Sequence, residues 1–530
     1  MLRRRLLFSL AVVLLLGQMA FAMVTTAVQQ SPTIDEPVYV ATAEVYTQRH
    51  SLLYNPEHPP LGKLAMAVGL AFGDAKLDPG FRGDQTLLGR HLLYETGNNP
   101  FRLMLAARLP IILLTLLFGL VVFFFARDIA GPWTGLLALA LYSFSPDVIA
   151  HGSLATLDVP ATGLLLTTFW MLWRSRTRPQ VYLPLAGVAL GAALATRMSA
   201  LPAVPIAVLL ALLSPAALRR ERRQVIGRII QALAVGVIAV GVVWVVYLAV
   251  DPRLRWTTPA GLPDPGGLRG LAVDLLPLPK AYRDGLLIQF RFENRSFNGF
   301  LLGHAYRGSR WYYLPIALLI KTPLGMLALW ALGTLTVLAK RRLWPVALYL
   351  LVPAAVLLLV AMTGSRDFGT RYVIFMPMFL AVVASTVVLT RVRWVKAGAV
   401  VLAAFVAVSS IRTFPYYLPY SNEAFGGTAN THNNLHDANV DWGQDLSRLA
   451  IRLRERYPGE PVWLVYKGSG VPSYYGISGR NPLSVPPDQV HGLLVVSDSR
   501  VALAKGALQQ LITTAKPIDQ VGYSITIYRR

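Results

Sequence analysis

Long apolar runs recur from one end of the chain to the other, and short polar connections separate them. Each run holds about 20 residues, which is enough to cross a bilayer core of roughly 30 Å. Hydropathy therefore predicts a polytopic, all-α membrane protein with about eleven spanning helices. We place them near residues 6–28, 102–126, 133–145, 154–173, 181–195, 200–213, 225–250, 311–338, 343–362, 372–389 and 395–411.

Three longer polar segments interrupt this pattern: 29–101, 251–310 and the tail 412–530. The first two hold amphipathic stretches that predict interfacial helices over 37–50, 60–72 and 280–292. In the tail, β-branched runs predict strands over 462–466, 493–497 and 524–528, with helices over 444–457 and 500–512. We therefore expect a transmembrane domain over 1–411 and a small α/β domain over 412–530.

Basic residues precede the first apolar run at positions 3–5 and then follow every second run, at positions 127, 174–178, 219–223, 340–342 and 391–396. The positive-inside rule then predicts a multi-pass protein of the plasma (inner) membrane with a cytoplasmic N-terminus and an extracytoplasmic tail. The first run has a second interpretation, because three arginines, an apolar stretch and Ala20-Phe21-Ala22 resemble a signal peptide. We favour a retained helix, since the uncharged run continues to Gln29.

Composition agrees with a membrane protein, because 54% of the 530 residues are apolar and 15% are charged, against about 25% charged in soluble domains. The net charge of +23 comes from clusters between apolar runs, so we expect no nucleic-acid partner. The chain has no cysteine, which excludes disulfides and thiolate metal sites.

The adjacent carboxylates Asp35 and Glu36 directly follow the first apolar run, and Pro37 comes next. Such a pair is typical of a helix start, where carboxylates accept from free N–H groups. It is equally typical of a general base held at the boundary between water and lipid.

Further charged and imidazole side chains gather where the polar segments meet the apolar runs. His58 and Lys63 flank two prolines, which stiffen the chain between them. In the functional interpretation, both side chains are aimed at a phosphate. Charged groups inside apolar runs are costly and indicate function by default. They are Asp158, Arg108, Arg197 and Lys321, and Asp147 and His151 lie in the connection just before Asp158.

These residues resemble a known family. The acidic pair, His58-Pro-Pro-Leu-Gly-Lys63 and the stretch 150–158 are similar to the protein O-mannosyltransferases. They are similar also to bacterial glycosyltransferases of the GT-C fold, including the lipid A aminoarabinose transferases. The segments 303–323 and 439–446 and the dipeptide Arg371-Tyr372 look like bacterial members of this group.

The resemblance implies an inverting glycosyltransferase that takes a sugar from a polyprenyl-phosphate carrier. Asp35 would be the base, and Glu36 would orient Asp35 or pair with Arg108. Asp158 would position the acceptor or a basic partner. The substrate-binding candidates are His58, Lys63, Arg108, His151, Lys321 and Arg371. The acceptor is a hydroxyl of a protein, a lipid or a glycan.

This chemistry requires no cofactor. A divalent cation could still take part, and its candidate ligands are Glu57, His58 and His304. We expect Lys321 and His58 to reach one phosphate pocket; the alternative is that Lys321 pairs with Asp158 or Glu36. The competing functions are a polysaccharide polymerase or ligase, a membrane transporter and a non-catalytic scaffold. Charges that cluster at one face favour chemistry on a lipid-borne substrate over transport.

Overall fold

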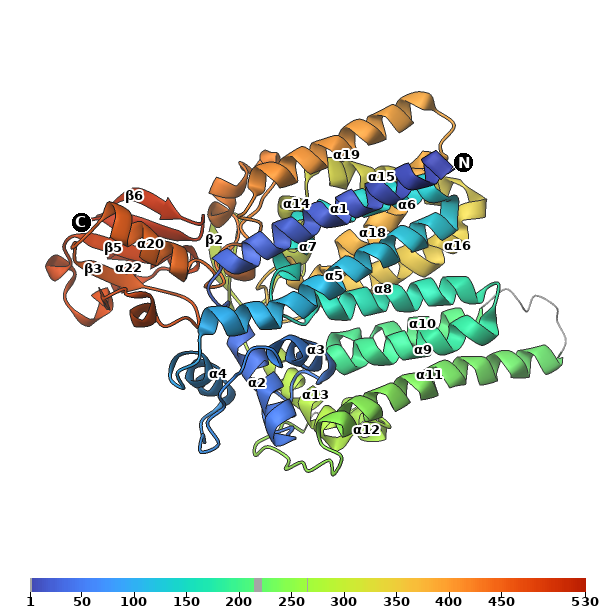
Figure 1. Cartoon of the computed structure of the whole chain (residues 1–530), viewed down its shortest axis with the longest axis horizontal. Helices are drawn as coiled ribbons and strands as arrows, with labels where there is room; N and C mark the ends of the chain where they lie inside the picture. Colours follow the sequence, from blue (N-terminus) through green and yellow to red (C-terminus); the bar gives the residue numbers. More distant parts are fainter. Residues whose placement is uncertain (1, 214–221, 265) are drawn as a thin grey trace.

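The computed structural model describes residues 2–213, 222–264 and 266–530 and is mostly helical. Its long helices lie side by side as a bundle, and the sheet of the tail lies at one end, on the left in Figure 1. The N-terminus lies at the other end. Two residues of the predicted basic clusters, Arg219 and Arg220, lie outside the described residues. The bundle consists of α1 (Leu2–Gln29), α5 (Pro100–Ala130), α6 (Pro132–Ser143), α7 (Pro146–Gly152), α8 (Asp158–Ser175), α9 (Pro179–Thr196), α10 (Ala203–Leu212), α11 (Arg222–Val250), α14 (Tyr313–Lys321), α15 (Leu324–Ala339), α17 (Val352–Ala361), α18 (Phe375–Ser385) and α19 (Arg393–Thr413).

The chain is a multi-pass membrane protein. Within the described residues, 6 helices are long and apolar enough to cross a bilayer, or up to 8 if each of two bent pairs is one span. Three shorter apolar helices accompany them, at Leu61–Leu70, Met198–Leu212 and Phe375–Leu389. The number of eleven spans stays a prediction.

One predicted helix is wrong as a single helix, because the run 311–338 is bent by 116° between α14 and α15. The helix predicted over 133–145 is present as α6, and a bend of 64° separates it from α7. Proline explains both breaks, because it lacks an N–H group and drives the preceding residue out of the helical region. Thr322, before Pro323, is accordingly extended, with φ −97° and ψ 131°. Lys321 therefore ends a helix at a corner and does not lie midway along one.

Shorter elements gather at the end of the bundle that carries the sheet (Figure 1). Helices are present where interfacial helices were predicted over 37–50, 60–72 and 280–292, and their place at the membrane surface stays a prediction. These elements are α2 (Glu36–Arg49), α3 (Leu61–Leu70), α4 (Gln85–Tyr94), α12 (Gly267–Leu275), α13 (Lys280–Glu293) and the hairpin of β1 (Asn298–Leu301) and β2 (His304–Arg307).

The tail forms a five-stranded mixed sheet of order β4-β3-β5-β7-β6. The three predicted strands are confirmed as β3 (Val462–Val465), β5 (Leu493–Ser497) and β7 (Ile525–Arg529). The strands β4 (Gly479–Arg480) and β6 (Lys516–Val521) were not predicted, because both are mostly exposed and lack apolar alternation. The helix α20 (Leu446–Arg456) packs Leu446, Leu449 and Leu453 on one face of the sheet, and the shorter helices are α21 (Asp498–Val501) and α22 (Gly506–Thr513).

Candidate active site

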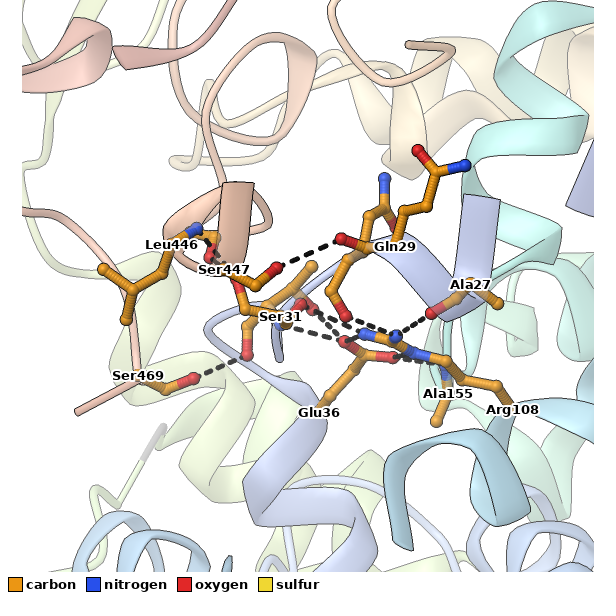
Figure 2. A network of polar contacts seen from close by, with 12 residues as sticks. Ala27, Gln29, Ser31, Glu36, Arg108, Ala155, Leu446, Ser447 and Ser469 are labelled. Carbon is orange, nitrogen blue, oxygen red and sulfur yellow. Dashed lines mark hydrogen bonds and ion pairs between the residues drawn. The ribbon is translucent and has the colours of Figure 1, made fainter. Parts of the chain in front are cut away.

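The segment between α1 and α2 carries the acidic pair, and the start of the tail holds it in place. The backbone N–H groups of Ser31 and Ile34 donate to the carbonyls of Gln444 and Trp442, both at 3.0 Å. The Ser31 hydroxyl donates to the Gly443 carbonyl and accepts from the N–H of Leu446, again at 3.0 Å. Figure 2 shows Ser31 between the start of α20 and the Arg108 side chain. Residues more than 400 positions apart thus meet at the acidic pair.

Glu36 and Arg108 form a fully buried bidentate ion pair, with both N···O distances at 2.7 Å (Figure 2). Glu36 also accepts from the N–H groups of Thr33 and Ala155, and Arg108 donates to three carbonyls at residues 27, 30 and 31. Burial alone would raise the pKa of Glu36, but the charge and hydrogen bonds of Arg108 outweigh it and lower that pKa. Every donor of the guanidinium is used, so neither side chain is free to bind substrate.

Asp35 faces away from this pair and is accessible. Its side chain is 26% exposed, and one oxygen lies 2.5 Å from Nη1 of Arg371. The Arg371 guanidinium lies 4.4 Å from the ring centroid of Trp442, a stacking that favours a cation. The Nε atom of Arg371 is buried and has no hydrogen-bond partner among the described residues. Arg371 therefore keeps a donor for a ligand.

Two further arginines converge on the same place. The guanidinium carbons of Arg197, Arg366 and Arg371 lie 5.6, 5.9 and 5.1 Å from the centroid of the Tyr372 ring. Arg197 pairs with Asp158, and Arg366 pairs with Glu293 of α13. Each of the three guanidinium groups is thus paired with a carboxylate, and the free Nε of Arg371 is the donor that this arginine group offers to an anionic ligand such as a phosphate.

His58 lies at the edge of this group, with its ring centroid 5.7 Å from that of Tyr39. Its Nδ1 atom is buried and lacks a partner in the part of the chain that the structure describes. Burial first, and then the charges of Arg197, Lys63, Arg366 and Arg371, hold the pKa of His58 well below its usual range. A neutral imidazole can donate or accept one hydrogen bond, but it does not supply the cation that the sequence suggested.

Two predicted phosphate ligands are fully occupied elsewhere. The ammonium of Lys63 donates to the backbone and side-chain oxygens of Asn55, both at 3.0 Å, and to the His58 carbonyl at 2.7 Å. Lys321 donates to the carbonyls of Leu418 and Asn439 at 2.5 and 3.1 Å, and lies 3.3 Å from Asp147. An ammonium has three donors, so the expected phosphate pocket shared by Lys321 and His58 lacks a free donor on Lys321. Its partner is Asp147, not Asp158 or Glu36.

His151 is buried behind the site, with its ring centroid 6.1 Å from that of Trp442. Neither ring nitrogen has a hydrogen-bond partner among the described residues. Buried polar atoms are nearly always paired, so we expect a water molecule or a polar ligand group to be the partner of this ring.

The suggested metal ligands do not assemble. The described residues contain no group of three or more His, Asp or Glu side chains that could hold a metal ion. Glu57 accepts a hydrogen bond from Gln85 at 2.7 Å, and His304 is exposed on the hairpin. Sequence reasoning missed Arg366 and Trp442 as site residues; Trp442 lies in the motif 439–446, which was a usable signal.

The chain is similar to known proteins in part of its sequence and in its fold. Residues 101–247 match the family model described as dolichyl-phosphate-mannose-protein mannosyltransferase. The crystal structure of apo ArnT from Cupriavidus metallidurans is 12% identical, with a TM-score of 0.51 over 98% of this chain and 97% of that chain. The chain therefore has a fold similar to that of ArnT, the GT-C fold.

Other solved structures give lower TM-scores. ArnT from Cupriavidus metallidurans bound to undecaprenyl phosphate gives a TM-score of 0.48 over 98% of this chain and 97% of that chain, at 12% identity. The oligosaccharyltransferase of Archaeoglobus fulgidus gives 0.43 over 84% of this chain and 58% of that chain, at 14% identity. No curated protein sequence matches this chain.

Proposed function

We propose that this protein is a glycosyltransferase that moves a sugar from a polyprenyl-phosphate carrier to a hydroxyl of a protein, lipid or glycan acceptor. The observation that carries the proposal is the accessible Asp35 paired with Arg371 beside two more arginines. ArnT, whose apo form shares the fold, has also been solved with undecaprenyl phosphate bound.

The proposed reaction is a direct displacement. The acceptor oxygen forms a bond to the anomeric carbon while the bond from that carbon to the phosphate oxygen breaks, which inverts the anomeric centre. Asp35 takes the proton of the acceptor hydroxyl. The leaving phosphate is already a weak base, so it needs charge stabilisation, which Arg371 and Arg197 supply from fixed positions.

The remaining predicted residues hold these groups in position. Glu36 and Arg108 fix the backbone on either side of Asp35, and Lys63 fixes the loop that carries His58. Asp158 holds Arg197, which is the basic partner anticipated for it. Lys321 ties the end of α14 to the tail.

We also propose that the site and the 412–530 domain lie outside the cytoplasm, with the N-terminus inside a plasma membrane. In support, the site and the sheet lie at one end of the bundle, and the basic connections near Lys340 and Arg391 lie at the other (Figure 1).

The test is the Asp35→Asn variant, assayed for transfer from a purified polyprenyl-phosphate sugar. Loss of a general base lowers the rate by about 10²–10⁴-fold. The matched control is Asp74→Asn, which removes an exposed carboxylate paired with Arg102 in the same polar segment. Unchanged thermal stability in both variants, with transfer lost only in Asp35→Asn, is the expected result. Near-full transfer by Asp35→Asn would place the base elsewhere.

A further inference from the structure

An apolar groove opens on the bundle at the end far from the site. Its cavity volume is about 560 Å³. α1 and α19 form its two sides and α6 lies between them, with lining residues Ala11, Leu14, Trp133, Leu137, Lys396 and Ala399. Because α1 and α19 are among the candidate spans, the groove faces lipid and is shaped for a hydrocarbon chain.

Lys396 lines this groove, and it belongs to a group of cations. The charges of Arg342, Arg391 and Lys396 act on Lys340, and Arg341 and Arg393 lie beside them in the sequence, which makes six basic residues in all. None of the six forms an ion pair in the part of the chain that the structure describes. At the same end of the bundle, the carboxylate of Asp128 is already paired with Arg174.

These cations repel one another. Partial burial first, and then the charges of Arg342, Arg391 and Lys396, lower the pKa of Lys340. Lys340 also donates to the Leu389 carbonyl at 2.9 Å, which fixes its ammonium within the cluster. A cluster of like charges without carboxylates is stabilised by an external anion.

Exposed tryptophans locate this cluster at headgroup depth. Trp133, Trp344 and Trp394 are 56%, 50% and 86% exposed, and tryptophan is enriched where a bilayer meets water. The cations therefore lie where lipid phosphates lie, and the groove runs from there along the apolar helices.

We propose that this groove binds one anionic phospholipid, with an acyl chain along α1, α6 and α19 and its phosphate on Lys396 and its basic neighbours. Charge complementarity selects the headgroup, because a zwitterionic lipid brings a cation along with its phosphate. This site is independent of the sugar-transfer proposal and lies at the opposite end of the bundle.

The test is native mass spectrometry of the purified full chain, titrated with phosphatidylglycerol or with phosphatidylcholine. We expect tighter binding of phosphatidylglycerol to wild type, and about fivefold weaker binding of it to Lys396→Gln, since one basic residue near the headgroups contributes ~1 kcal/mol. Arg391→Gln should act similarly, and both variants should bind phosphatidylcholine as wild type does.

The matched control is Arg178→Gln, which removes an exposed arginine at the start of α9, away from the groove. It should bind both lipids as wild type does. Ala140→Phe places a ring in the groove and should weaken binding of both lipids. Equal binding of the two lipids by wild type, unchanged phosphatidylglycerol binding by Lys396→Gln, or full displacement by inorganic phosphate would overturn the proposal.

Discussion

The buried cations of this protein are of two kinds: in some, every N–H donor has a hydrogen-bond partner, and in others one donor is free. Arg108 and Lys321 use every donor on carbonyls and a carboxylate, whereas Arg371 keeps a buried Nε free beside Asp35. A saturated buried cation fixes the backbone around it, and a partly free one is available to a ligand. The number of N–H donors that lack a partner therefore distinguishes the cations that hold the fold from those that are candidates to bind a ligand.

The buried ion pair of Glu36 and Arg108 should be a stability determinant. Glu36→Gln leaves the Arg108 charge buried without its partner, which costs about 3–5 kcal/mol. We expect a clear drop of the melting temperature in detergent, measured by intrinsic fluorescence. The double variant Glu36→Gln with Arg108→Met removes both charges and should recover part of the loss. A melting temperature of Glu36→Gln equal to that of wild type would contradict the structural role.

Among the elements, the contact between the segment 30–36 and the start of α20 decides where Asp35 lies. Ser31→Ala removes the acceptor of the buried Leu446 N–H group, which costs about 1–3 kcal/mol. We expect faster hydrogen exchange at residues 442–446 and a lower kcat with little change in KM. Ser447→Ala is the control, because its hydroxyl makes one exposed bond to Gln29. Equal losses in both variants would argue against a specific positioning role.

The junction between the tail and the bundle should respond to pH through Asp441. Burial raises the pKa of Asp441 to about 7, Lys467 opposes this, and Asp498 adds to it. The folded state therefore binds the proton more tightly than the unfolded state does, and stability falls as pH rises toward 7, by about 1.4 kcal/mol for each pH unit between the two pKa values. Asp441→Asn should flatten this dependence in thermal melts between pH 5 and 8. An unchanged slope would place the titrating group elsewhere.

Much of the element pattern was predictable, because helices such as α3 and α13 have clear apolar periodicity. Hydropathy placed 311–338 in one span, since the residues on both sides of Thr322 and Pro323 are apolar and hydropathy does not register a bend, although a proline inside a helix indicates one. The sequence also did not predict that all three N–H donors of the Lys321 ammonium have partners within the protein. Its partners are carbonyls of Leu418 and Asn439, about 100 residues away, and any residue could supply them.

At the scale of the whole molecule, the sheet and the arginine group share one end of the bundle, and the basic cluster around Lys396 occupies the other (Figure 1). This polarity predicts the sidedness of the protein. A reporter that is active only in the cytoplasm, fused after Arg530, should be silent, and the same reporter fused before the first helix should be active. Activity after Arg530 would reverse the proposed orientation.

The contact of Ser31 with Leu446 also sets an order of events during synthesis. The two residues are 415 positions apart, so the segment with Asp35 leaves the ribosome long before its partner exists. Until the tail has been made and has joined α1 on the same side of the bilayer, the Ser31 hydroxyl lacks its bond to Leu446 and Arg371 lacks the Trp442 ring. A nascent chain that stops before the tail thus carries Asp35, the proposed base, without the contacts that position it, and the candidate active site is completed only after the tail has been made.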